Sequence, residues 1–431
     1  MTISKRNIFL VSEIKQIGKD ISMDKWEYLF LFFQLIIFAD MWKYSRSDYI
    51  LILDFVISVC LAIRRSVEWK KVFLVVGIIS FLMIPPIIKY GLDELTVFQY
   101  GGYGLRVMTG CFIAAYYRND FAVKLENLIF LLACISLPLF LLQCIDPHIY
   151  DIFTPLSKRV MSGRQGYSAV DSLSITMHQY FFIYTLNGWG GNRNSGFMWE
   201  PAAFGAMLSW ALLICMYRAR FHWHPRMLVY IIAILTTFSL GTYSYAMVLM
   251  FMFFVHRMEW KKMLYMLIVL LGIIVLFSQV DLFQNQAQMM EEKIGSYQAE
   301  GSSQVVKERK EYVMQDHQSV RVNRLAQVYI LTDLLLENPF GVGMNGWGFW
   351  SANGLVSYTM MWGIPGIIVL IVAFGLFAKK MAGQAQLRVK WYVLCMTILV
   401  LIMPMFGNPI YNQVFLMIML CSPLFMEISK V

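Results

Sequence analysis

Charged residues are scarce in this chain. Asp, Glu, Lys and Arg make up 15% of its 431 residues, whereas soluble domains typically carry about 25%. Hydrophobic residues make up 58%, and the mean hydropathy is +0.58. This composition excludes a disordered, collagen-like or coiled-coil protein. A chain this apolar cannot bury all of its apolar surface away from water, so part of that surface must face the lipid bilayer.

Several catalytic and metal-binding signatures are also missing. The chain has no Walker A motif, no Gly-x-Ser-x-Gly elbow and no Asp-x-Asp pair, which removes the usual ligands of a metal-bound pyrophosphate. The six histidines form no ligand cluster, and the seven cysteines all fall inside apolar runs. They form neither a disulfide framework nor a zinc motif. We therefore expect no cofactor and no metal ion.

Apolar runs of membrane-spanning character follow one another along the chain. A span needs about 20 mostly apolar residues. The sequence predicts an all-α, polytopic membrane protein of about twelve spans, so both termini lie on the same side. The run 221–256 is interpreted as two helices joined at Ser239-Leu240-Gly241-Thr242, because Gly with Ser and Thr is typical of turns. The predicted spans cover residues 26–42, 49–63, 71–88, 101–117, 126–146, 197–217, 221–240, 242–256, 262–279, 355–378, 391–406 and 409–427.

The distribution of Lys and Arg gives the orientation. The tail before Trp26 and short connectors such as Arg64-Arg65 and Lys379-Lys380 are dense in positive charge, and these segments share one side. The positive-inside rule places that side, with both termini, in the cytoplasm. Treating 221–256 as a single span weakens the asymmetry. The net charge of +9 therefore reflects topology, and we expect no nucleic-acid partner.

Two long segments, 147–196 and 280–354, then lie outside the cytoplasm, and residues 1–431 form a single integral membrane domain. In the second segment, apolar residues recur at helical spacing over 323–337, and Pro339 follows the end of that helix. We expect short helices in both long segments.

Charges inside spans are unfavourable, so each one is a functional candidate. Asp54 and Arg106 both lie inside predicted spans. One interpretation is a structural ion pair between the two. The other is that Arg106 binds an anionic substrate, because a planar guanidinium suits carboxylates and phosphates.

A second candidate stands at the outer mouth of the span 197–217. Arg193 and Glu200 flank Gly196, and Pro201 suits the first turn of a helix. Glu200 then sits beside a helix N-terminus, where the dipole favours an anion. The plain alternative is that Glu200 caps the helix and Arg193 is an interfacial anchor.

A third candidate is the pair Arg321 and Arg324. The two are three residues apart, so on a helix they project from one face. On an outer membrane surface such a pair can bind phosphate, and the alternative is a solvated helix face. Gly341-x-Gly343 further along does not by itself indicate a dinucleotide loop, because its strand–helix context is missing.

Taken in order, these motifs resemble the Wzy-type O-antigen and exopolysaccharide polymerases, which share a superfamily with the O-antigen ligases. The resemblance covers roughly residues 190–425, and the earlier part matches only as a series of spans containing Arg106. The matching elements are Arg193-x-x-Gly196-x-x-x-Glu200-Pro201, the turn from Thr236 to Thr242, Arg324 fifteen residues before Pro339-x-Gly341-x-Gly343, and Trp362-Gly363-Ile364-Pro365-Gly366 opening a late span.

The resemblance implies a GT-C-like glycosyltransferase that works at the outer leaflet of the bacterial cytoplasmic membrane. Its substrates are undecaprenyl-pyrophosphate-linked oligosaccharide repeat units, and the growing glycan passes from its carrier onto a new lipid-linked unit. A chain-length regulator is a further possible partner. Arg193 and Arg324 are then the pyrophosphate ligands, and Arg106 and Arg321 contribute to substrate binding. Glu200 is either the general base or the group that orients Arg193.

One position departs from the ligase pattern. The ligases carry a histidine just before an Asn in the stretch after Gly-x-Gly, and here Ala352 precedes Asn353. We assign Asn353 to substrate binding and favour a polymerase over a ligase. A lipid-linked glycan transporter or flippase is the alternative from another class. Internal repeats and broken helices mark such transporters, and the sequence indicates neither.

Overall fold

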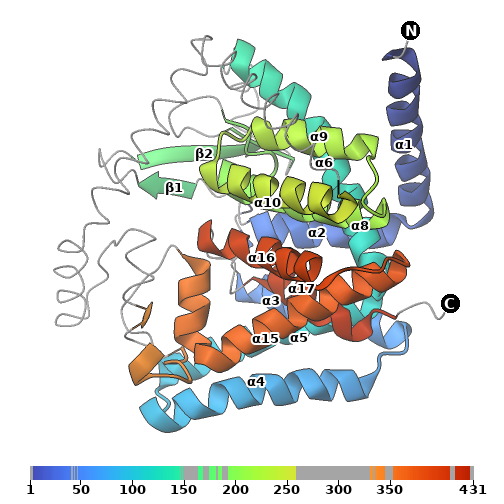
Figure 1. Ribbon diagram of the computed structural model, residues 1–431. Helices are drawn as coiled ribbons and strands as arrows, with labels where there is room; N and C mark the ends of the chain where they lie inside the picture. Colours follow the sequence, from blue (N-terminus) through green and yellow to red (C-terminus); the bar gives the residue numbers. More distant parts are fainter. Residues whose placement is uncertain are drawn as a thin grey trace.

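The computed structural model describes a predominantly helical protein (Figure 1). It describes residues 3–39, 42, 44–45, 47–146, 148, 164–167, 174–180, 183–186, 193–258, 331–332, 335–344, 353–407 and 413–427. The helices are α1 (Ile3–Met23), α2 (Lys25–Ala39), α3 (Asp48–Arg64), α4 (Trp69–Tyr90), α5 (Glu94–Tyr117), α6 (Asp120–Ile145), α8 (Pro201–Arg218), α9 (Pro225–Leu235), α10 (Leu240–Arg257), α15 (Gly354–Gln384), α16 (Trp391–Gly407) and α17 (Val414–Phe425).

A helix lies within or overlaps each of eleven of the twelve predicted apolar runs, and the twelfth run, 262–279, lies outside the described residues. The run 221–256 does form two helices, with a turn at 236–239 between α9 and α10. Helix α1 was not predicted, because its sequence is too polar for a span. Among the side chains of α1 that the structure describes, Ile17 is fully buried and most of the others are exposed, as expected for a helix that the bundle covers only in part.

Among the helices that the structure describes, four are long and apolar enough to cross a membrane: α4, α6, α8 and α15. Helices α9, α16 and α17 are apolar but shorter. Helix α4 exposes Phe73, Phe81, Ile84 and Ile88. Soluble proteins rarely expose an apolar surface of this size to water. The protein is therefore membrane-embedded, and the total of twelve crossings stays a prediction.

A small antiparallel sheet forms in the described part of 147–196, where short helices were expected. Its strands, in the order β1 (Arg164–Tyr167), β2 (Ser174–Tyr180) and β3 (Tyr184–Leu186), pair with their sequence neighbours. Strand β3 is tied to the helices, since the Tyr184 hydroxyl donates to Oε1 of Gln143 on α6 at 2.5 Å. The expectation of short helices is therefore wrong for this part of the segment, where neighbouring strands pair instead.

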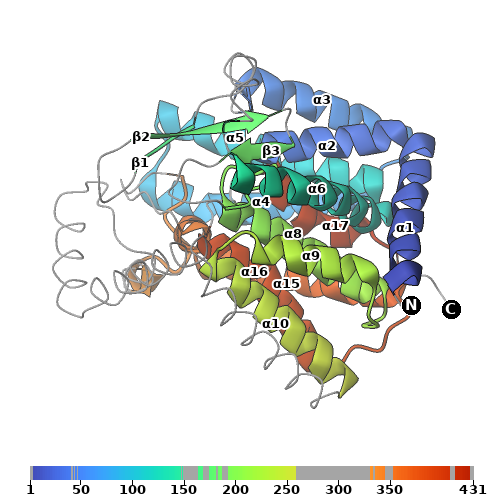
Figure 2. The same cartoon turned by 90° about the horizontal axis from the view of Figure 1, so that it is seen from above.

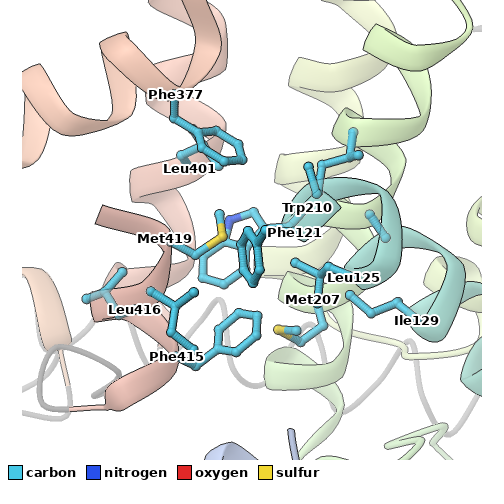
Figure 3. Packing of buried hydrophobic residues seen from close by; sticks show 14 of the residues in the cluster. Phe121, Leu125, Ile129, Met207, Trp210, Phe377, Leu401, Phe415, Leu416 and Met419 are labelled. Carbon is cyan, nitrogen blue, oxygen red and sulfur yellow. The ribbon is translucent and has the colours of Figure 1, made fainter. Parts of the chain in front are cut away.

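Helix α8 is buried almost all round and forms the centre of the bundle. It packs against α6, α9, α10 and α16. Figure 3 shows Trp210 of α8 among side chains of α6 and α17. The rings of Trp210 and Phe415 are stacked with centroids 6.1 Å apart. A helix with apolar residues on every face needs apolar surroundings on all sides, and this central position provides them.

The two ends of the bundle differ. The sheet lies at one end of the bundle, and α1 lies across the opposite end (Figures 1 and 2). At the α1 end, the fully buried carboxylate of Glu126 accepts from Arg226 at 2.7 Å and from the Tyr230 hydroxyl at 2.7 Å, and it also pairs with Arg218. Glu13 of α1 joins the network through Arg226 at 2.8 Å. The charges of this network are therefore paired with one another.

Candidate functional site

The segment before α8 is fixed onto the turn between α9 and α10. The backbone N–H of Asn194 donates to the Thr236 carbonyl at 2.9 Å, and its side-chain amide donates to the Thr236 hydroxyl at 2.9 Å. The same amide also reaches the hydroxyl of Ser136 on α6 at 3.3 Å. Gly196 donates its N–H to Oδ1 of Asn194 at 2.9 Å and adopts a positive φ of 49°, which glycine tolerates best.

This arrangement orients the guanidinium of Arg193. Its Nε donates to the carbonyl of Thr237 at 3.2 Å. Within the described part of the chain, the two terminal nitrogens of Arg193 have no hydrogen-bond or ion-pair partner. Burial lowers the pKa of Arg193, and the nearby carboxylate of Glu200 partly offsets that effect. An arginine remains protonated under such conditions, so the site presents a fixed positive charge.

Glu200 occupies the position expected from the sequence. Helix α8 begins at Pro201, and Glu200 is its N-cap residue in an extended conformation. Its side chain nevertheless accepts no capping hydrogen bond. It acts on Arg193 electrostatically, but the two form no ion pair in the described residues. The side chain therefore does not cap α8 by a hydrogen bond, as the plain alternative expected, and the half-buried carboxylate lies close enough to Arg193 to act on its charge.

Close packing holds the start of α8 against α10. A Cβ on Gly205 would lie 2.0 Å from Oγ1 of Thr242, and a Cβ on Gly196 would lie 2.5 Å from the ring of Phe204. Both glycines are thus required by their neighbours. Two motifs that stand about 40 residues apart in the sequence, 193–206 and 236–242, form one structural unit.

A second unit joins the segment Pro339–Gly343 to α15. Helix α15 is broken at Gly363, which has a φ of 59°. Val342 and Gly343 donate their N–H groups to the carbonyls of Met360 and Met361 at 2.8 and 2.9 Å, and Ile364 donates to the Pro339 carbonyl at 2.9 Å. The segment Pro339–Gly343 and the break around Gly363 therefore hydrogen-bond to each other through their backbone N–H and carbonyl groups.

This break corrects two expectations. The run Trp362–Gly366 does not open a late span but interrupts α15, which already begins at Gly354. The chain also contains a broken helix, although the sequence indicated none. Pro365 removes a backbone donor, and the left-handed Gly363 turns the chain. The freed carbonyls of α15 accept hydrogen bonds from the neighbouring loop, so in this state they are not open to a transported ion.

The ends of α4 and α5 support this second unit. Lys89 of α4 donates to the side-chain oxygen of Asn338 at 2.6 Å, and the neighbouring Tyr90 hydroxyl bonds to the same oxygen. On α5, Tyr103 packs against the buried Trp362 with ring centroids 4.9 Å apart. These contacts hold the residue before Pro339 and the residue before the break at Gly363, one on each side of the second unit.

The remaining predicted residues lie elsewhere or outside the described structure. Arg106 of α5 interacts electrostatically with Asp48 at the start of α3. The predicted pair between Arg106 and Asp54 does not form, because Asp54 is bonded to Gln34 instead. Asn353 is the N-cap of α15 and accepts from the Val356 N–H at 3.2 Å.

Arg321 and Arg324 lie outside the described residues. Their predicted place near Arg193 therefore stays a prediction, as does the role of Asn353 in binding substrate.

Two residues of the site carried no assigned role in the sequence. Asn194 and Thr237 fix the position of Arg193, although neither is charged. The only indication in the sequence that these two residues belong to the site is that they stand next to, or inside, motifs already singled out. Asn194 stands next to Arg193, and Thr237 belongs to the turn 236–242.

Comparison with other proteins adds no further assignment. No protein-family model, no curated protein and no solved structure matches this chain. Among the described residues, no group of three or more His, Cys, Asp or Glu side chains is placed to hold a metal ion. The chemistry of the site is therefore argued from Arg193 and Glu200 themselves.

Proposed function

We propose that this protein is a polysaccharide polymerase. It transfers a growing glycan from undecaprenyl pyrophosphate onto a lipid-linked oligosaccharide repeat unit at the outer leaflet of the bacterial cytoplasmic membrane. One observation supports this most: the guanidinium of Arg193 is oriented by the Thr237 carbonyl, while its terminal nitrogens are unpaired within the described residues. A fixed guanidinium with unused donors suits a phosphate group.

In the proposed reaction, a hydroxyl of the acceptor sugar attacks the anomeric carbon of the donor. The bond from that carbon to the pyrophosphate oxygen breaks, and the lipid pyrophosphate leaves with additional negative charge. Arg193 stabilises this developing charge, and Arg324 is the second ligand that the resemblance suggests. Arg321 and Arg106 contribute to binding the anionic substrate.

Glu200 is proposed to accept the proton that the attacking hydroxyl loses. The role of orienting Arg193 is less favoured, because that guanidinium takes its orientation from a backbone carbonyl and forms no ion pair with Glu200 within the described residues. A carboxylate that is not used as a helix cap is available for general base catalysis.

The experiment compares Arg193→Ala and Arg193→Lys in purified protein reconstituted with lipid-linked repeat units. Arg220 at the far end of α8 is exposed and serves as the control when changed to Ala. We expect both Arg193 variants to lose at least about a hundredfold in rate, since removal of one donor to developing charge costs roughly that much. Full polymer formation by Arg193→Lys would contradict a two-point contact with phosphate.

A deletion strain distinguishes the proposed function from its rivals. Loss of a polymerase leaves single repeat units on the final acceptor. Loss of an O-antigen ligase leaves polymer on the lipid carrier, and loss of a flippase traps the units at the cytoplasmic leaflet. The break in α15 keeps the transporter as the second candidate, because broken helices occur in transporters.

A further inference from the structure

A polar pair lies inside the bundle, away from the Arg193 site. Gln34 of α2 and Asp54 of α3 are both 1% exposed. The side-chain amide of Gln34 donates to Oδ1 of Asp54 at 2.6 Å. The hydroxyl of Ser58 bonds to the backbone carbonyl of Asp54 and not to its carboxyl group. Asp54 is about 9 Å along α3 from its first residue, so the pair lies well inside the bundle.

Two oxygens of this pair have no partner. Oδ2 of Asp54 and Oε1 of Gln34 are fully buried and accept no hydrogen bond in the part of the chain that the structure describes. No described Lys, Arg or His forms an ion pair with Asp54. An ionised Asp54 would thus be a buried negative charge with one neutral donor.

Physical chemistry limits what can complete such a pair. An isolated carboxylate in an apolar interior is strongly unfavourable and is relieved by neutralisation. A metal cation is a poor solution, because hard cations take about six or more oxygen ligands and this pair offers two free ones. A bridging water would supply donors but would leave the charge. A proton removes the charge and turns Oδ2 into a donor.

We propose that Asp54 and Gln34 form a proton-binding site inside the bundle. The carboxylate of Asp54 takes up one proton from water on Oδ2 and becomes a neutral carboxylic acid. Oδ1 keeps its hydrogen bond from the Gln34 amide, and Oε1 of Gln34 is an acceptor on the same pair for the new hydroxyl. The neutral acid links α2 to α3 without placing a charge in the membrane. This inference does not depend on glycosyl transfer.

Infrared difference spectroscopy tests the proposal on the full-length protein in lipid nanodiscs at neutral pH. The spectrum of Asp54→Asn is subtracted from that of the wild type. We expect the difference to contain the carbonyl band of a protonated carboxylic acid, and we expect that band to shift in D2O. The control Asp120→Asn changes an exposed aspartate and should remove the two bands of an ionised carboxylate.

A second variant tests the pairing itself. Gln34→Leu removes the amide partner, so the acid band should remain but move to higher frequency as its hydrogen bonds are lost. The comparison of Gln34→Leu with the wild type can still test the proposal if Asp54→Asn does not fold. Carboxylate bands in the wild-type minus Asp54→Asn difference would overturn the proposal. An acid band that does not move in Gln34→Leu would also overturn it.

Discussion

Replacing Asn194 by Ala is the sharpest test of how the site is built. The Asn194 side chain is fully buried and makes three hydrogen bonds: to the Thr236 hydroxyl, to the Ser136 hydroxyl and from the Gly196 N–H. The two hydroxyls keep other partners, because each also donates to a carbonyl of its own helix. The buried N–H of Gly196 has no such substitute among the described contacts.

The size of the effect follows from that difference. Leaving a buried donor unsatisfied costs about 1–3 kcal/mol, and each lost neutral hydrogen bond contributes about 1 kcal/mol. With one buried donor left unsatisfied and two further bonds lost, we therefore expect Asn194→Ala to lower the free energy of unfolding by about 3–5 kcal/mol. The same change should reduce glycan polymerisation, because the orientation of Arg193 depends on this segment.

Reversible unfolding in mixed micelles measures this change, with Ser136→Ala as the control. That control removes the longest of the three Asn194 bonds, at 3.3 Å, together with the bond from the Ser136 hydroxyl to the Ala133 carbonyl. It leaves no buried N–H group without a partner and should cost about 1 kcal/mol. If Asn194→Ala unfolds at the same denaturant concentration as the wild type, the segment before α8 is not held by this side chain and the reasoning fails.

Three further predictions concern the rest of the molecule. Gly363→Ala should destabilise the protein by about 1–3 kcal/mol, because Gly363 has a φ of 59° and the new Cβ would lie 2.2 Å from the Pro339 carbonyl oxygen. Gly375→Ala in the same helix is the control, and in the same unfolding assay it should leave the stability unchanged or raise it. Glu126→Leu should cost about 3–5 kcal/mol in that assay, because two arginines lose a buried partner. A cysteine in place of His148 should react with an impermeant maleimide in intact cells, and one in place of Arg388 should not; the reverse result contradicts the predicted orientation.

Most of the helical framework could be predicted from the sequence because apolar runs and turn residues are local signals. The turn between α9 and α10 illustrates this, since it lies within two or three residues of the predicted Ser239–Thr242 junction. Helix α1 and the sheet could not be predicted in the same way. A partly covered helix and short strands obtain their stability from contacts with distant segments, and those contacts leave no periodic trace in their own sequence.

The candidate site could be predicted only in part. The charge of Arg193 and the place of Glu200 before Pro201 follow from the sequence, because a charge and a helix start are local features. The hydrogen bond from Arg193 to Thr237 spans 44 residues. Similarly, nothing in the sequence pairs Gln34 with Asp54 rather than Arg106 with Asp54. Such pairings depend on how helices rotate about their axes, which only tertiary packing fixes.

The contrast between the two ends of the bundle bears on where a ligand would act. At the α1 end, Glu126 interacts with two arginines and a tyrosine, so ion pairs and hydrogen bonds within the protein offset the cost of removing these charges from water. At the other end, Arg193 and Glu200 lie near each other without an ion pair in the described residues, and the structure offers their charged groups little compensation. A stable fold does not need such an arrangement. An anionic substrate would supply the missing partner for Arg193, and a sugar hydroxyl would supply a donor for Glu200. The proposed glycosyl transfer is therefore placed at this end, and the network around Glu126 is expected to stabilise the fold.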